Sequence, residues 1–298
     1  MEKLAGLLSF GKPRQPKLQI MSDLHLEVGQ QYASFQFPAT APFLVLAGDI
    51  GRLVDYQGLL GFLERQAPRY RKVFLALGNH EFYGTSYEQG LDAARRLVRE
   101  PRLQDKVVLL HRTRWDDPDS RLTVLGCTLW SRIPPAAEDV IRFKVSDFKQ
   151  IEGWSIQKHN QQHGEEARWL LDQARQLAGA QSSDDARRAV CIVTHHAPSL
   201  VGTSSPQHAD GPVTPAFATE LLLSDDDSSS TRCGGRPWEA VRAWVFGHTH
   251  YSTDFACRGI RVVANQRGYV FAATTAAREK RWRRRDVHQF DPAKAIAV

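Results

Sequence analysis

The stretch that decides the fold is Val73-Phe74-Leu75-Ala76-Leu77-Gly78-Asn79-His80-Glu81. Its apolar first half, residues 73–77, predicts a buried strand, which a glycine ends. The last three side chains have groups that can bind a metal ion or transfer a proton. Open α/β sheets bind ligands at the carboxyl ends of their strands, which is where these groups follow. A strand followed by an ordinary polar turn has the same pattern, so the stretch needs support from the rest of the chain.

Four further apolar segments end in the same way. In each of them a strand-like run is followed, directly or after one glycine, by an aspartate or a histidine. Parallel strands bring their carboxyl ends to one edge of a sheet, so the sequence predicts that these side chains meet. The runs and the residues that follow them are 18–22 with Asp23 and His25, 43–47 with Asp49, 190–194 with His195 and His196, and 243–246 with His248 and His250.

Length and composition are typical of a globular protein. Of the 298 residues, 42% are apolar and 24% are charged, and no repeat or linker divides the chain. We therefore expect a single domain over residues 1–298. No run approaches the roughly 18 consecutive apolar residues of a membrane span, and the first residues do not have the pattern of a signal peptide. These features predict a cytoplasmic protein without a membrane partner.

Two segments depart from the average composition. Residues 224–235 are polar and of low complexity, so a disordered loop is expected there. Residues 278–285 hold six basic residues, one glutamate and one tryptophan, and supply most of the formal net charge of +6. A basic run with a tryptophan can bind nucleic acid, but one short run is more typical of a solvated tail. Nucleic acid is therefore not the predicted partner.

Helical and strand-like segments alternate in the first half of the chain. Apolar residues recur at helical spacing in 57–65, 87–99 and 163–178. Strand-like runs lie at 107–110, 122–128 and 260–264. Strands that alternate with helices favour an α/β layered architecture.

The residues at the strand ends have the chemistry of a metal site. Asp23 and His25 are two residues apart, as are His248 and His250, so each pair lies on one side of an extended segment. Imidazole mixed with carboxylate or amide oxygen suits Mn, Fe, Zn, Co or Ni better than Ca. Seven candidate ligands exceed the needs of one tetrahedral ion. They suit two ions with a shared carboxylate, an arrangement that hydrolyses phosphate esters.

Taken together, the five motifs resemble those of the calcineurin-like metallophosphoesterases, and they occur in the order typical of that family. A narrower resemblance, to uncharacterised phosphohydrolases of that family, rests on the sequence MSDLHLE at 21–27 and on Asn265-Gln266-Arg267-Gly268-Tyr269. The family motifs are Asp23-Leu24-His25, Gly48-Asp49, Gly78-Asn79-His80-Glu81, Thr194-His195-His196 and Gly247-His248-Thr249-His250.

This resemblance implies an α/β fold in which two sheets form a sandwich flanked by helices. The aromatic, basic and histidine residues of 130–165 separately make that segment the candidate for a cap. The resemblance also implies two divalent ions, Mn, Fe or Zn, and a phosphoric ester hydrolase activity. One ion would be bound by Asp23, His25 and His250, the other by Asn79, His195 and His248, with Asp49 as the bridging ligand.

The resemblance makes His80 the expected general acid, with Glu81 as its orienting partner or simply as an acid in a first helical turn. Adjacent residues at a strand end point to opposite faces, so only one of His195 and His196 is expected to bind metal. We predict His195 as the ligand. His196 would then pack against the pocket wall or touch the substrate.

Two arginines and two segments are further candidates for substrate contacts. Arg267 can hold a phosphate by a bidentate contact or lie on the surface, and the same alternatives apply to Arg52. The aromatic and histidine residues of 130–165 can stack on a base or sugar, or form a helical lid packed on the core. Residues 198–215 are expected to form a second loop over the site.

The predicted function is hydrolysis of a small organic phosphate mono- or diester, with a nucleotide as one such substrate. A protein phosphatase needs an open groove, which a cap at 130–165 disfavours. A nuclease has only the basic run at 278–285 in its favour. A non-catalytic metal-binding scaffold predicts missing ligands or a missing His80, and all are present. No obligate protein partner is indicated.

Overall fold

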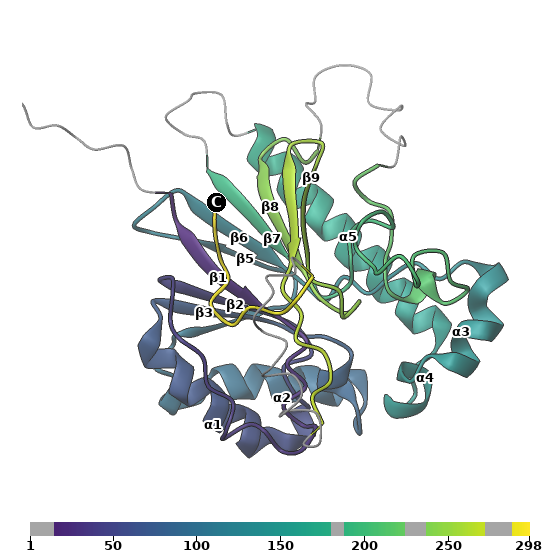
Figure 1. Ribbon diagram of the computed structural model, residues 1–298, viewed down its shortest axis with the longest axis horizontal. Helices are drawn as coiled ribbons and strands as arrows, with labels where there is room; N and C mark the ends of the chain where they lie inside the picture. Colours follow the sequence, from purple (N-terminus) through teal and green to yellow (C-terminus); the bar gives the residue numbers. More distant parts are fainter. Residues whose placement is uncertain (1–14, 180–187, 224–236, 272–287) are drawn as a thin grey trace, which may run out of the picture.

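The computed structural model describes residues 15–179, 188–223, 237–271 and 288–298. Two β-sheets pack face to face and helices cover their outer faces (Figure 1). The predicted α/β sandwich is therefore confirmed. The predicted loop at 224–235 and basic tail at 278–285 lie outside the described residues.

The first sheet has five strands in the order β11-β1-β2-β3-β4. Strands β1 to β4 are parallel, and β11 is antiparallel to β1. The strands are β1 (Lys17–Met21), β2 (Phe43–Ala47), β3 (Lys72–Ala76), β4 (Val107–Leu110) and β11 (Ala295–Ala297).

The second sheet has six strands in the order β5-β6-β7-β8-β10-β9. Its inner strands are parallel, and the two edge strands are antiparallel to their neighbours. The strands are β5 (Thr113–Asp116), β6 (Leu122–Gly126), β7 (Ala189–Val193), β8 (Val241–Phe246), β9 (Thr253–Cys257) and β10 (Ile260–Ala264).

Alternate residues of the central strands face two different cores. In β2, Val45 packs between the sheets with Val193 and Val245 of the second sheet. Leu44 and Leu46, on the other face of the same strand, pack under the helices. Because both faces are covered, the parallel strands are continuous apolar runs, as the sequence shows.

Three long helices cover the sandwich (Figure 1). Helices α1 (Tyr56–Gln66) and α2 (Tyr87–Val98) pack on the first sheet, and α5 (Ile156–Gly179) packs on the second. The helices predicted at 57–65, 87–99 and 163–178 are thus present, although α5 begins seven residues earlier than expected.

The short helices α3 (Glu138–Lys144) and α4 (Asp147–Gln150) extend to one side of the molecule, at the right in Figure 1. They belong to the segment 130–165 that the sequence predicts as a cap. Short 3₁₀ helices occur at Leu53–Asp55, Ala67–Arg69, His80–Phe82, Pro101–Leu103, Pro135–Ala137 and Thr214–Ala216. Among the helices in the described ranges, none combines the length and the apolar character that crossing a membrane would require.

Candidate metal centre

The residues that follow five strands meet between the two sheets. The backbone amide of Gly247, after β8, donates to the carbonyl of His195, after β7, at 2.9 Å. The His195 ring bonds through Nδ1 to the carbonyl of Ala47, at the end of β2 in the other sheet, also at 2.9 Å. The amide of His248 donates to the Asp23 carboxylate at 2.9 Å, which joins β8 to β1. The predicted convergence of the strand ends is therefore present.

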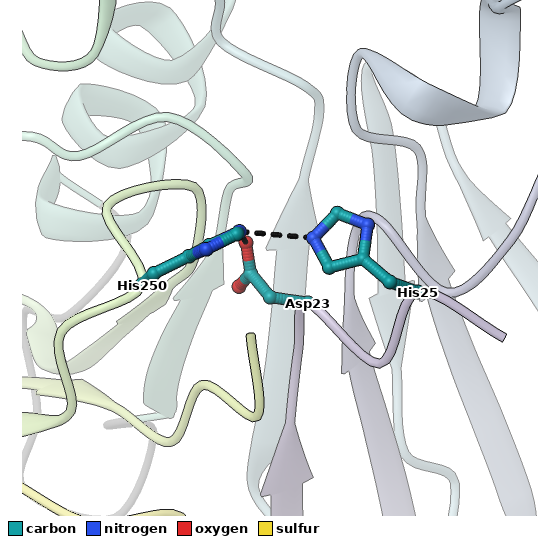
Figure 2. Close-up of side chains that lie close together, drawn as sticks. All are labelled: Asp23, His25 and His250. Carbon is teal, nitrogen blue, oxygen red and sulfur yellow. Dashed lines mark hydrogen bonds and ion pairs between the residues drawn. The ribbon is translucent and has the colours of Figure 1, made fainter. Parts of the chain in front are cut away.

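One group of side chains contains Asp23, His25 and His250, whose ligand atoms all lie within 4.8 Å of one another. Figure 2 shows these side chains pointing at a common point, with His25 Nε2 2.9 Å from His250 Nε2. Asp23 Oδ1 is 3.5 Å from His250 Nε2. Atoms bound to one metal ion at about 2.1 Å, at angles between square and tetrahedral, lie about 3.0–3.4 Å apart. The separations match the spacing of ligands around one ion.

A second group contains Asp49, His195 and His248, again with ligand atoms within 4.8 Å. His195 Nε2 is 3.2 Å from His248 Nδ1 and 3.4 Å from Asp49 Oδ1. The amide oxygen of Asn79 joins the group at 3.1 Å from His195 Nε2. This group therefore brings together the same types of ligand atom as the first, with an amide oxygen added.

Asp49 lies between the two groups. Its Oδ1 faces His195 of the second group at 3.4 Å, and its Oδ2 faces His25 of the first group at 3.8 Å. The side chain is almost fully buried. A carboxylate with one oxygen towards each group is placed as a bridging ligand would be.

The hydrogen bonds of the histidines test whether these groups suit a metal ion. His195 Nδ1 is 2.9 Å from a backbone carbonyl oxygen, so this nitrogen must hold a proton, and in the neutral ring that binds metal it is Nε2 that presents its lone pair to the centre. His25 is arranged in the same way, because its Nδ1 lies 3.1 Å from Glu27 Oε1 and its Nε2 faces His250. Metal-binding histidines commonly have such a partner on the other ring nitrogen. The donor set therefore fits a metal ion.

The electrostatics of the centre favour cations. Burial opposes protonation of His195, but the charge of Asp49 raises its pKa to about 10. Burial likewise opposes protonation of His80, whose pKa Asp49 and Glu27 raise to about 9. In return, although burial disfavours its charge, His195 and His80 hold the pKa of Asp49 well below its usual range. The buried carboxylates thus stabilise positive charge on His195 and His80, whereas burial lowers the pKa of His248 and His250.

The backbone is strained at the same residues. Asp23, His25, Asp49, His248 and His250 have φ values of 52°, 46°, 53°, 71° and 51°. This left-handed region is uncommon for residues other than glycine, and each such residue costs about 1–3 kcal/mol. Strain that clusters on five proposed ligands is typical of a functional site rather than of a turn selected for stability.

Glu81 holds the loops after β2 and β3 together. Its buried carboxylate accepts four backbone N–H bonds, so it does not orient His80, as one sequence-based alternative proposed. Burial raises its pKa to about 7. The donors are the amides of Asp49 at 2.9 Å, Ile50 at 2.8 Å, Gly51 at 3.3 Å and Gly78 at 2.5 Å.

His80 lies at the open side of the centre and has two partners that the sequence analysis did not assign. Its Nδ1 is 2.9 Å from Glu27 Oε1, and its Nε2 is 3.0 Å from the hydroxyl of Tyr269. The ring of Tyr83 stacks on it at 4.2 Å. The carboxylate of Glu27, two residues after the motif at 23–25, was a signal for the first partner.

His195 and His196 diverge, as alternation predicts. The rings are at 83° to each other, and His195 faces the centre. His196 is fully buried and packs 4.1 Å from the His248 ring and 5.3 Å from the Trp130 ring. This position favours the pocket-wall alternative for His196 over contact with the substrate.

Arg267 directs its guanidinium at the loop after β1. Nη1 donates to the carbonyl of Leu24 at 3.0 Å and Nη2 to Gln31 Oε1 at 2.7 Å, while the group lies over the Phe35 ring. These contacts do not favour the phosphate-binding alternative for Arg267. Arg52 is paired with Asp55 at 3.1 Å.

The aromatic residues of 130–165 are divided between core and surface. Trp130 and Trp154 are buried with ring centroids 4.5 Å apart, so they belong to a packed lid rather than to an open stacking surface. Phe143 is 76% exposed. In the loop 198–215, the Thr203 carbonyl accepts a bond from Thr249 at 2.7 Å, which connects this loop to the residues after β8.

Comparisons with known proteins agree with this geometry. The family model described as calcineurin-like phosphoesterase matches residues 17–252. An uncharacterized protein, L509, of Acanthamoeba polyphaga mimivirus is 26% identical over 278 residues, which cover 85% of this chain and 91% of that protein. The crystal structure of a phosphopantetheinyl hydrolase from Mycobacterium tuberculosis has a TM-score of 0.58 at 18% identity, with 91% of this chain and 93% of that chain covered. At this level of identity, the likeness shows a shared fold only.

Proposed function

The chain belongs to the calcineurin-like phosphoesterase family and is a metal-dependent phosphoester hydrolase, and on that premise we propose that it hydrolyses a small organic phosphate mono- or diester at two divalent ions. The observation that carries the proposal is the place of Asp49 between two groups of ligand atoms. One carboxylate between two such groups is the arrangement that a dinuclear centre needs.

The proposed ligands follow the two groups. Asp23, His25 and His250 would bind one ion, and Asn79, His195 and His248 the other. Asp49 would bind both. Manganese, iron and zinc all accept this mixture of imidazole nitrogen with carboxylate and amide oxygen. When bound, two such ions polarise phosphoryl oxygens and lower the pKa of a bound water.

The geometry of His80 supports its proposed role as the general acid. Glu27 fixes the ring through Nδ1, so Nε2 is the atom that can deliver a proton to the leaving oxygen. The same nitrogen faces Tyr269, whose ring lies 4.3 Å from the His25 ring and is 43% exposed. The substrate is therefore proposed to approach from the Tyr269 side.

The proposal is tested with metal-stripped enzyme to which Mn²⁺ is added back. Bis-p-nitrophenyl phosphate and p-nitrophenyl phosphate are assayed side by side, with Asp49→Ala as the inactive control. We expect turnover that needs metal and is lost in Asp49→Ala, and the preferred reagent identifies a diester or monoester preference. Failure of both reagents, and of a following panel of nucleotides, sugar phosphates and a phosphopantetheinyl compound, would contradict the proposal.

A further inference from the structure

We propose that Asp147, on helix α4, is a positioning residue that fixes the amide of Asn79 with its oxygen towards the second metal ion. The inference rests on the proposed function, since it takes Asn79 as a ligand. It adds that the segment 130–165, which the sequence predicts as a cap, contributes to the metal centre itself.

The three side chains form a closed hydrogen-bonded unit. Asn79 Nδ2 donates to Asp147 Oδ1 at 2.8 Å and to the hydroxyl oxygen of Tyr83 at 3.1 Å. The Tyr83 hydroxyl donates its own proton to Asp147 Oδ1 at 2.7 Å. Asp147 is 1% exposed and Asn79 is 4% exposed, so water does not replace these bonds easily.

This unit decides which end of the Asn79 amide faces the metal centre. Asp147 Oδ1 can only accept, so the atom of Asn79 that faces it must be the NH₂ group. The amide oxygen then points the other way, where it lies 3.1 Å from His195 Nε2. A flipped amide would set two acceptor oxygens against each other and would present NH₂, which cannot bind a cation, to the second ion.

The arrangement does not depend on the charge of Asp147. Its other oxygen, Oδ2, is buried and has no hydrogen-bond partner within the described ranges. A proton taken up by the carboxyl group would reside on Oδ2. Oδ1 therefore accepts from Asn79 and Tyr83 in either protonation state.

Backbone bonds fix α4 against the loop that carries Asn79. The amide of Gly84 donates to the carbonyl of Gln150 at 2.9 Å, and the amide of Glu152 donates to the carbonyl of Thr85 at 3.0 Å. The C-terminal end of helix α4 and the residues just after it are thus bonded to Gly84 and Thr85, which follow the Asn79 loop. Occupation of the second metal site should consequently be linked to the docking of α4, because the same contacts orient the ligand.

The test compares metal binding by Asp147→Leu and Tyr83→Phe with wild type, all reconstituted with Mn²⁺. The readouts are ions bound per chain and the electron paramagnetic resonance spectrum, which differs between a coupled pair and an isolated ion. Loss of such a supporting bond commonly weakens metal binding by about 10–100-fold. We therefore expect Asp147→Leu to keep one ion, with an isolated-ion spectrum, at a concentration that fills wild type with two. Tyr83→Phe should weaken the binding of the second ion less than Asp147→Leu does.

Two control variants separate orientation from packing. Phe148→Leu alters the adjacent residue of α4 without touching the oxygen network. Asp139→Leu makes the same substitution on α3, where the side chain is 99% exposed. Both should bind two ions as wild type does. Melting temperatures in EDTA report any loss of stability that is independent of metal.

Each outcome decides the inference. The inference would be overturned if Asp147→Leu and Tyr83→Phe both bind the second ion as tightly as wild type does. It would also be overturned if Phe148→Leu loses the second ion to the same extent as Asp147→Leu. If Asp147→Leu fails to fold in EDTA, Tyr83→Phe decides alone. If wild type binds two ions and hydrolyses phosphate esters, and the variants do the same, only this inference is overturned. A wild-type protein that binds fewer than two ions would overturn the proposed function as well.

Discussion

At the scale of single residues, the ligand types are readable from the sequence but their orientations are not. Asp23, His25 and Asp49 follow apolar runs within three residues, and the recurrence of this order along the chain predicts a metal site. The left-handed backbone of these residues depends on the loops around them and has no local signal. The sequence likewise does not show the different roles of Glu27 and Glu81, because a carboxylate binds whichever donors the tertiary fold brings to it.

The role of His80 predicts a dependence on the leaving group. His80→Ala should lower kcat by about 10²–10⁴-fold for an alkyl phosphate, whose leaving oxygen needs a proton. The loss should be much smaller for p-nitrophenyl phosphate, because its leaving group departs without one. The measurement is steady-state kinetics with matched metal content, confirmed by metal analysis. Equal losses for both substrates would mean that His80 does not act as the acid.

At the scale of elements, the apolar runs predict the central strands well because both faces of those strands are buried. The segment 130–165 was harder to predict. The sequence shows its aromatic residues, but whether Trp130 faces a substrate or the core depends on how α5 docks on β6. The boundaries of α5 shifted for the same reason, since tertiary contacts extend helices beyond their periodic part.

The docking of α5 predicts a pH-dependent stability. Glu166 on this helix is fully buried, and burial raises its pKa from 4.5 to about 8. Its neighbour His111, 3.8 Å away, has a pKa that burial lowers to about 4, so the pair is neutral near pH 7. Between pH 6.5 and 8 the folded protein keeps the Glu166 proton that the unfolded chain releases, so the stability falls as the pH rises. Between pH 4.5 and 6.5 the lowered pKa of His111 offsets this contribution, because there the unfolded chain keeps the His111 proton that the folded protein releases.

Glu166→Gln resembles the protonated side chain and should remove this effect. We expect its free energy of unfolding to exceed that of wild type by about 4 kcal/mol near pH 8, but by only about 1 kcal/mol near pH 5. Urea unfolding of the metal-free proteins at the two pH values is the measurement, with Glu165→Gln, on the exposed side of the helix, as the control. Parallel pH profiles for wild type and Glu166→Gln would contradict the prediction.

At the scale of the whole molecule, the proposed centre lies where two sheets meet, and neither sheet forms it alone. The first sheet supplies Asp23, His25, Asp49 and Asn79, and the second supplies the three remaining proposed ligands, His195, His248 and His250. Strand order cannot be read from the runs themselves, because it is set by crossovers between segments far apart in sequence. The family resemblance predicted two packed sheets flanked by helices but no strand order, and the structure confirms the two sheets.

The central claim is that two ions bind at this junction with Asp49 between them. The most direct test is the anomalous diffraction of a Mn²⁺-soaked crystal, measured near the manganese edge. The account predicts two peaks about 3.5–4 Å apart, one beside Asp23, His25 and His250 and one beside Asn79, His195 and His248, with Asp49 in contact with both. A single peak, or two peaks that Asp49 does not join, would contradict it.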